Sequence, residues 1–449
     1  MSNALNVAKL LEHIDELSNT IKIQNRVLLD LKEQRRHTRR KLNNFRDPMA
    51  RLPLEIQSQI FLDVEGNACD LPQSSEAPMN FLRICQLWRA IALATPQLWS
   101  SLRIQWLPRK ASYIKFCDLW MERSGPLPFS LYLKGELQLT TQMQDLMTRH
   151  RDRLQNLTLE LVGELTEENA LTRHILVKGP FLSLQTLEIR TEDEMYFRTV
   201  NEWVDLLAAA PALTKCTLDN MYVEWEDWGR NGFPEPLPAR PLLHTSLREL
   251  RLGDVNYYAA WVDHGSSAAM LLYLTLPALQ TLHFTHFDIT HKEFRSFMAR
   301  SWTSPPLRSL SMVVERETSV SGMATWLRSM CSLTNLSLFM MSSYNRSSSS
   351  ERILELLEAL DGILPALHTL TISMNSGEEF DYRRLARFLH TRRTGQQTPF
   401  ATFRLYITPR SGGRFTDLKL NDDVLAPFRL LAEDGLDVHI GLEGQNLLV

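Results

Sequence analysis

The segment Leu333-Thr334-Asn335-Leu336-Ser337-Leu338 shows the pattern that decides the fold. Its first, fourth and sixth residues are apolar, and the residues between them are polar. The pattern occurs nine times along the chain, at intervals of 26 to 34 residues. The copies begin at Leu154, Leu184, Leu213, Leu247, Leu279, Leu307, Leu333, Leu367 and Phe400. Repetition at this period predicts a stack of similar units with one continuous core, rather than several independent domains.

The third and fifth residues of the nine copies are polar throughout. Such alternation predicts strands with one buried face and one wet face. Between the strands, apolar residues recur at helical spacing, as in Met323, Trp326, Leu327 and Met330. The pattern resembles that of leucine-rich repeats, and the resemblance implies an α/β fold over residues 103–449. In that fold parallel strands line the concave face and helices lie outside. Weaker copies at 129–133 and 436–440 are expected to be terminal units.

The wet face of the strands is the predicted surface for a target protein, because solenoids bind along their strand face. The candidate target-binding residues are Glu188, Arg190, Lys215, Asp219, Arg251, His283, Arg404 and Tyr406. The alternative is that these residues form an ordinary solvated strand surface.

Two short motifs precede the repeats. The first reads Leu52-Pro53-x-Glu55-Ile56, and the second reads Ile84-Cys85-x-x-Trp88-Arg89, with Pro96-x-Leu98-Trp99 behind it. Over residues 51–102 these motifs resemble the F-box, and the trailing one is similar to a variant of mushroom-forming fungi. The stretch from Asp63 to Asn80 is longer than the usual connector and is expected to loop out.

The F-box resemblance implies a partner, a Skp-type adaptor, and through it a cullin–RING ubiquitin ligase. A three-helix unit of this size does not bury all its apolar surface alone, so some of that surface is expected to contact the adaptor. The adaptor-binding candidates are Leu52, Pro53, Ile56, Ile60, Phe61, Ile84, Cys85 and Trp88. Some of them must form the internal core instead, and the sequence does not separate the two groups.

Near the start of the chain, apolar residues are spaced alternately three and four apart, as in the seam of a coiled coil. The row consists of Val7, Leu10, Ile14, Leu17, Ile21, Gln24, Leu28 and Leu31. It predicts a helix over residues 1–31 whose stripe is covered by a coiled-coil partner, identical or different, or by the protein's own body.

A basic connector is expected over residues 32–50. It carries Lys32, Arg35, Arg36, Arg39, Arg40, Lys41 and Arg46, opposed only by Glu33. In a basic-zipper protein the basic helix precedes the zipper, whereas here it follows. A connector or a nuclear-import signal is therefore favoured over nucleic-acid binding.

The composition favours a folded intracellular protein, in the cytoplasm or, if the basic segment is an import signal, the nucleus. The chain has 449 residues, 44% of them hydrophobic and 22% charged, with a net charge of −3. Five scattered cysteines form no C-x-x-C pair, and no span of apolar residues is long enough to cross a membrane. Phosphate-binding, zincin and nucleophile motifs are absent from the sequence. No enzymatic activity, cofactor or metal is expected.

These patterns together predict the substrate-recognition adaptor of a Skp–cullin–F-box type ligase. The alternative is a non-catalytic leucine-rich-repeat scaffold that its coiled coil assembles and that joins no ligase.

Overall fold

The chain divides into two compact units in the computed structural model. One unit comprises Met1–Arg103 with Leu119–Leu127, and the other comprises Ile104–Asp118 with Pro128–Val449. The structure describes residues 2–64, 77–106, 111–136, 141–162, 179–197, 200–223, 240–253, 268–284, 291–302, 306–314, 319–340, 349–360, 362–375, 380–395, 400–408, 420–442 and 444–448.

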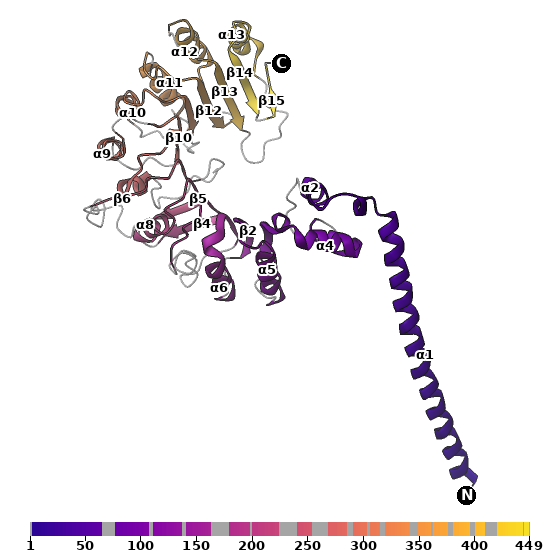
Figure 1. The fold of residues 1–449 in the computed structure, drawn as a ribbon. Coiled ribbons are helices and arrows are strands. Elements are labelled where there is room, and N and C mark those ends of the chain that lie inside the picture. Colours follow the sequence, from indigo (N-terminus) through magenta and orange to yellow (C-terminus); the bar gives the residue numbers. More distant parts are fainter. Residues whose placement is uncertain are drawn as a thin grey trace. The chain divides into compact units, whose positions relative to one another are not determined.

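The first unit begins with one long helix, α1 (Ser2–Arg46; Figure 1). The expected helix is present, but the basic segment is not a separate connector, because the helix continues through it. Lysine, arginine, glutamate and glutamine are good helix formers, so nothing stops the helix before Pro48. The side chain of Asp47 then accepts a hydrogen bond from the Met49 amide and starts a 3-10 turn, η1 (Pro48–Arg51).

A small helical unit follows α1. Its elements are α2 (Leu54–Val64), α3 (Phe81–Ile84), α4 (Gln86–Ala94) and the 3-10 turn η2 (Pro96–Trp99). The sequence predicts one continuous stripe over residues 84–91, but Cys85 has extended backbone angles and separates two helices. As a result Ile84 is exposed whereas Ile91 is buried. Most of the expected long connector, residues 65–76, lies outside the described residues.

The second unit is organised around a sheet of thirteen strands. In spatial order they are β1 (Ser101–Trp106), β2 (Phe129–Glu136), β3 (Leu154–Val162), β4 (Thr186–Phe197), β5 (Lys215–Val223), β7 (Glu249–Leu252), β9 (Thr281–Phe284), β10 (Ser309–Val314), β11 (Asn335–Met340), β12 (Thr369–Asn375), β13 (Thr402–Thr408), β14 (Asp437–Leu442) and β15 (Gln445–Asn446). A separate two-stranded sheet pairs β6 (Leu242–Leu243) with β8 (Leu274–Thr275).

The strands from β2 to β14 pair in parallel, and their register follows the repeat. Third-position residues lie opposite one another, as Asn335 lies between Ser309 and Thr369. All nine predicted strands are therefore confirmed, and so are the two weaker strands, β2 and β14. These two are not the terminal strands, because β1 lies beyond β2 and β15 lies beyond β14. The last pair, β14 with β15, is antiparallel and closes the C-terminal edge.

Helices cover one face of this sheet (Figure 1). Along the chain, the described helices that follow the small helical unit are α5 (Ala111–Arg123), α6 (Thr141–His150), α8 (Val200–Ala208), α9 (His291–Ser301), α10 (Val320–Leu327), α11 (Ser349–Ala359), α12 (Tyr382–Gly395) and α13 (Asp422–Glu433). Strand and helix side chains meet in a shared core, where the Phe403 ring on β13 stacks on Phe428 of α13 with 6.3 Å between centroids. Neighbouring helices also touch, through Phe294 and Trp326 at 4.8 Å.

The opposite side of the sheet, which we call the open face, carries the third, fifth and seventh residues of each repeat. Along β11 and β13 buried and half-buried residues alternate strictly. This confirms the alternation of the sequence: the apolar positions face the helices, and the polar ones face away from them. The architecture is thus mixed α/β, with a long N-terminal helix and a sheet of parallel strands.

Candidate functional site

Three aromatic rings form the centre of the helical unit. Phe61 stacks on Phe81 with 4.2 Å between ring centroids, and Trp88 packs against both at 5.1 and 5.9 Å. Phe61 is only 1% exposed. The sequence analysis counts Phe61 among the adaptor-binding candidates. The structure corrects this, because the Phe61 ring is buried in the unit's own core and is not exposed to a partner.

Asp47 connects the end of α1 to α4. One carboxylate oxygen, Oδ2, accepts a hydrogen bond from Trp88 Nε1 at 2.9 Å and lies 3.7 Å from the Cys85 thiol. Cys85 in turn caps α4, since its sulfur accepts from the Trp88 amide at 3.4 Å. Cys85 and Trp88, both expected to contact an adaptor, are therefore half-buried and already bonded within the unit. Asp47 was not among the residues singled out from the sequence.

Gln57 shapes the segment at the start of α2. Its side chain is buried, and its amide donates to the carbonyl oxygens of Met49 at 2.7 Å and Leu52 at 2.8 Å. These two bonds satisfy backbone acceptors that precede the helix. With the backbone held in this way, the side chains of Leu52 and Pro53 are exposed to solvent.

Six apolar side chains of this segment, of α2 and of α3 are exposed to solvent. We call this set the apolar face; it comprises Leu52, Leu54, Ile56, Ile60, Val64 and Ile84, each between 37 and 61% exposed. Ile56, Ile60 and Val64 follow one another at i, i+4 and i+8 and so form one stripe of α2. The sequence identified four of the six residues. Leu54 and Val64 were missed, although the spacing of Val64 from Ile60 was a usable signal.

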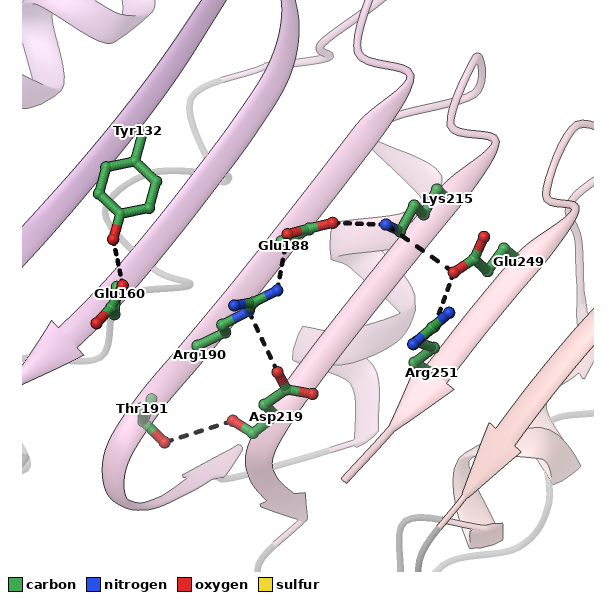
Figure 2. A network of polar contacts seen from close by, with 9 residues as sticks. All are labelled: Tyr132, Glu160, Glu188, Arg190, Thr191, Lys215, Asp219, Glu249 and Arg251. Carbon is green, nitrogen blue, oxygen red and sulfur yellow. Dashed lines mark hydrogen bonds and ion pairs between the residues drawn. The ribbon is translucent and has the colours of Figure 1, made fainter. Parts of the chain in front are cut away.

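On the open face, the first strands carry oppositely charged residues side by side. Arg190 of β4 lies in register with Asp219 of β5, and their Nε and Oδ2 atoms are 3.4 Å apart (Figure 2). Lys134 of β2 likewise lies in register with Glu160 of β3 and forms an ion pair with it. Charges therefore alternate in sign across four neighbouring strands, the arrangement that stabilises cross-strand pairs.

Glu160 is the anion of this row whose pKa its neighbours lower. It accepts hydrogen bonds from Lys134 and from the Tyr132 hydroxyl. Partial burial alone would raise the pKa of Glu160, but these two bonds and the positive charges of Lys134 and Arg190 lower it below its ordinary value. Glu160 is consequently ionised at neutral pH and is already neutralised by its neighbours.

A second chain of ion pairs runs across β4, β5 and β7. Lys215 lies 2.7 Å from Glu188 and 3.9 Å from Glu249, measured from Nζ to Oε1 in each case. Arg251 Nε lies 2.7 Å from the same Glu249 oxygen, and Arg190 reaches back to Glu188 at 3.3 Å. Figure 2 shows these side chains pointing toward one another across β4, β5 and β7.

We call this whole set the charge ladder. Its cations are Lys134, Arg190, Lys215 and Arg251, and its anions are Glu160, Glu188, Asp219 and Glu249. With four of each, the ladder carries no net charge and offers patterned hydrogen-bonding groups rather than a field for a polyanion. The structure brings together five of the eight predicted target-binding residues here. Lys134 and Tyr132 were missed because their strand was read only as a weak terminal copy.

His283 does not belong to an exposed surface, in contrast to the sequence-based expectation. It is 4% exposed, its ring packs edge-on against Phe339 at 5.8 Å, and its Nε2 has no hydrogen-bond partner among the described residues. Burial, and secondarily the charge of Arg251, lowers the pKa of His283 from 6.5 to about 4. The residue is neutral at physiological pH. His286, which the sequence places nearby, lies outside the described residues.

Arg404 and Tyr406 lie on β13, five strands away from β7, the last strand of the charge ladder, with β9, β10, β11 and β12 between them. At the usual strand spacing this is roughly 24 Å from the charge ladder. Arg404 pairs with Asp437 through two nitrogens, one of them 3.1 Å from Oδ1, and Tyr406 packs on His439 at 5.3 Å. The predicted target-binding residues thus form two separate groups and do not converge on one pocket.

The described part of the chain contains no group of three histidine, cysteine or acidic residues arranged to hold a metal ion. Within the same residues, no helix combines the length and apolarity needed to cross a bilayer. Cys85, Cys117, Cys216 and Cys331 are free thiols.

Comparison with known proteins adds little beyond the geometry. No protein-family model matches the chain, and no curated protein matches it. Among solved structures, the leucine-rich repeat-containing protein LegL7 from Legionella pneumophila is similar, with 14% sequence identity and a TM-score of 0.34. That match covers 74% of this chain and 98% of the other. So low a TM-score assigns no fold, and the architecture therefore rests on the strand pairing described above.

Proposed function

We propose that the chain is a substrate-recognition adaptor of a Skp–cullin–F-box type ubiquitin ligase. The apolar face of the helical unit binds a Skp-type adaptor. The open face of the repeats, a leucine-rich-repeat solenoid in this proposal, binds a target protein. Ubiquitin transfer is carried out by the other subunits of the ligase.

The exposure of the apolar face is the observation that carries this proposal. Phe61, Phe81 and Trp88 already complete an internal core, so Ile56, Ile60 and Ile84 are not needed to fill it. Exposed aliphatic side chains that follow one another along a helix, as Ile56, Ile60 and Val64 do on α2, are a mark of an interaction site. The F-box resemblance supplies the class of partner, and the exposed residues coincide with four of the positions that it implicates.

The charge ladder supports the second half of the proposal. A partner that binds there exchanges hydrogen bonds with groups that are already ordered by their neighbours, so little side-chain entropy is lost on binding. Because the ladder is electrically neutral, its partner is expected to present mixed charges, as an ordinary protein surface does, and not a polyanion.

Co-purification tests adaptor binding. The full-length chain, expressed with a Skp-type adaptor and a cullin from its own organism, is captured through a tag, and the recovered adaptor is quantified. We expect recovery with the unaltered chain and a loss of about 100-fold in affinity with the double variant Ile56→Asp/Ile60→Asp, since two charges then occupy a desolvated interface.

A control uses Leu430→Asp, which places an aspartate on another exposed apolar side chain, on α13. This variant is expected to retain the adaptor in full. Equal recovery with the double variant and the control, or no recovery with the unaltered chain, would contradict the proposal.

A non-catalytic scaffold is the second candidate function. The exposed seam of α1 favours it, since a self-assembling helix attached to a repeat unit is sufficient to gather other proteins. Target proteins recovered with the chain in the absence of adaptor and cullin would decide for this candidate.

A further inference from the structure

Helix α1 carries a seam of large apolar side chains that the rest of the chain leaves uncovered. In heptad positions, Val7, Ile14, Ile21 and Leu28 occupy a, and Leu10, Leu17, Gln24 and Leu31 occupy d. The seven apolar members are 48 to 63% exposed. An isolated helix gains little stability from its own hydrogen bonds in water, so a seam of this length indicates a partner helix.

We propose that α1 pairs with α1 of a second copy of the chain, as a parallel two-stranded coiled coil in register. The residue types of the seam give the number of strands. Three of the four a positions are β-branched, and three of the four d positions are leucine. In parallel coiled coils this distribution favours dimers over trimers and tetramers.

Gln24 gives the orientation and the register. In a parallel, in-register pair it faces Gln24 of the second copy, and each amide donates to the oxygen of the other. In an antiparallel pair a positions face d positions. Gln24 would then lie opposite Val7, Ile14, Ile21 or Leu28, depending on the register, and its amide would be buried without a partner. A single polar layer of this kind selects one alignment out of many.

The flanks of the seam favour an identical partner. The e positions hold Leu11, Ser18, Asn25 and Lys32, and the described g positions hold His13, Thr20 and Val27. Charges at these positions normally determine which chains pair. Here almost none are present, so nothing repels a second copy and nothing selects a chain of complementary charge.

The basic half of α1 supplies a test of the orientation. Beyond Leu31 the next a position is Arg35, and the segment from Lys32 to Arg46 has seven basic residues and one acidic residue. A parallel pair brings two such segments side by side, and their repulsion weakens the dimer. Added salt screens that repulsion, so a parallel dimer is strengthened by salt, whereas an antiparallel one holds these segments apart.

Cross-linking tests the alignment directly. Leu10→Cys is introduced into full-length chain carrying Cys331→Ser, which removes the exposed native thiol. Oxidised glutathione accepts the two electrons as the two introduced thiols form a disulfide. We expect a covalent dimer, because position 10 faces itself in a parallel pair. The Cys331→Ser chain alone is expected to give none.

The antiparallel alternative has its own signature. In the antiparallel register that pairs the whole seam, position 10 faces position 28, so a mixture of Leu10→Cys and Leu28→Cys chains would form mixed dimers while Leu10→Cys alone would not. That result would overturn the proposal, and so would the absence of any cross-linked product.

Sedimentation equilibrium tests the seam itself. Ile21→Lys, at an a position, is expected to raise the dimer dissociation constant about 100-fold, because a charge then lies in the buried layer. The matched control is Ile23→Lys, at an outward c position of similar exposure, and should change it less than about threefold. Raising salt from about 0.1 to about 0.5 M should tighten the unaltered dimer. A monomer at all concentrations, a trimer, or equal effects of the two variants would overturn the proposal.

Discussion

Isoleucine is used in opposite ways in the two compact units. On β12 of the repeat unit, Ile372 is fully buried between neighbouring strands and helices, whereas Ile56 of the helical unit is 48% exposed. Each repeat covers the apolar side of the next, so the sheet is complete in itself. The helical unit fills a small core and leaves an apolar face beside it. The repeat unit therefore covers its own apolar side, while the helical unit leaves aliphatic side chains exposed that the proposed adaptor would cover.

The largest expected effect contrasts these two isoleucines. Ile372→Ala should destabilise the repeat unit by about 3 kcal/mol, because it leaves a cavity in a close-packed core. Ile56→Ala should change the stability of the helical unit by less than about 0.5 kcal/mol, because its side chain is already in water. Hydrogen exchange at increasing guanidinium concentration, read on peptides of each unit in the full-length chain, measures both. Similar losses of stability in the two variants would contradict this contrast between the two units.

His283 makes the stability of the repeat unit depend on pH. The unfolded residue binds a proton near pH 6.5, whereas the folded one, with its pKa lowered to about 4, does not. The unfolded state therefore gains protons first as the pH falls. Between pH 7 and pH 5 the unit should lose about 2 kcal/mol, and the loss should level off below pH 4.

Urea unfolding at a series of pH values, compared with His283→Gln, isolates this residue. The variant should show a flatter dependence on pH between 7 and 5. The control His368→Gln, at an exposed position directly before β12, should keep the dependence of the unaltered chain. An unchanged slope in His283→Gln would mean that the histidine is hydrated in solution.

Asp47 is expected to contribute to the stability of the helical unit, because its carboxylate accepts two hydrogen bonds. Asp47→Ala removes the acceptor of Trp88 Nε1 and of the Met49 amide, and should destabilise that unit by about 1.5 kcal/mol. Asp63→Ala, which loses one exposed bond from Gln59, should cost less than about 0.5 kcal/mol. Tryptophan fluorescence during denaturant unfolding follows both variants, and equal midpoints would show that the Asp47 contacts are dispensable.

The smallest effect is expected in the charge ladder. Arg190→Ala should change stability by less than about 1 kcal/mol, because its ion pairs with Glu188 and Asp219 are partly exposed and screened. A double-mutant cycle with Asp219→Ala gives the coupling. A coupling above about 2 kcal/mol would show that the ladder stabilises the sheet, and would weaken its interpretation as a binding surface.

Most of the repeat architecture could be predicted from the sequence, because its signal is periodic. Each strand copies the pattern of its neighbours, so the register of Asn335 with Ser309 and Thr369 follows from aligning the copies. The burial of His283 could not be predicted in this way. A polar residue at a position of the open face is expected to be exposed. Only the packing around His283, here with Phe339, shows that it is buried.

The candidate site of the helical unit was predictable in part. Helical spacing placed Ile56 and Ile60 together, but it could not separate contact residues from core residues such as Phe61. That division depends on a break at Cys85 and on a long-range bond from Trp88 to Asp47. Neither has a periodic signal, since both arise from residues that meet only in the folded chain.

Hydroxyl-radical footprinting of the full-length chain, alone and with a purified Skp-type adaptor, gives the sharpest test of the proposed adaptor contact, because it reports the solvent exposure of individual side chains. We predict that Leu52, Ile56 and Ile60 lose reactivity when the adaptor is added, while Leu430 on α13 keeps it. Unchanged reactivity at these three residues at saturating adaptor would contradict the account.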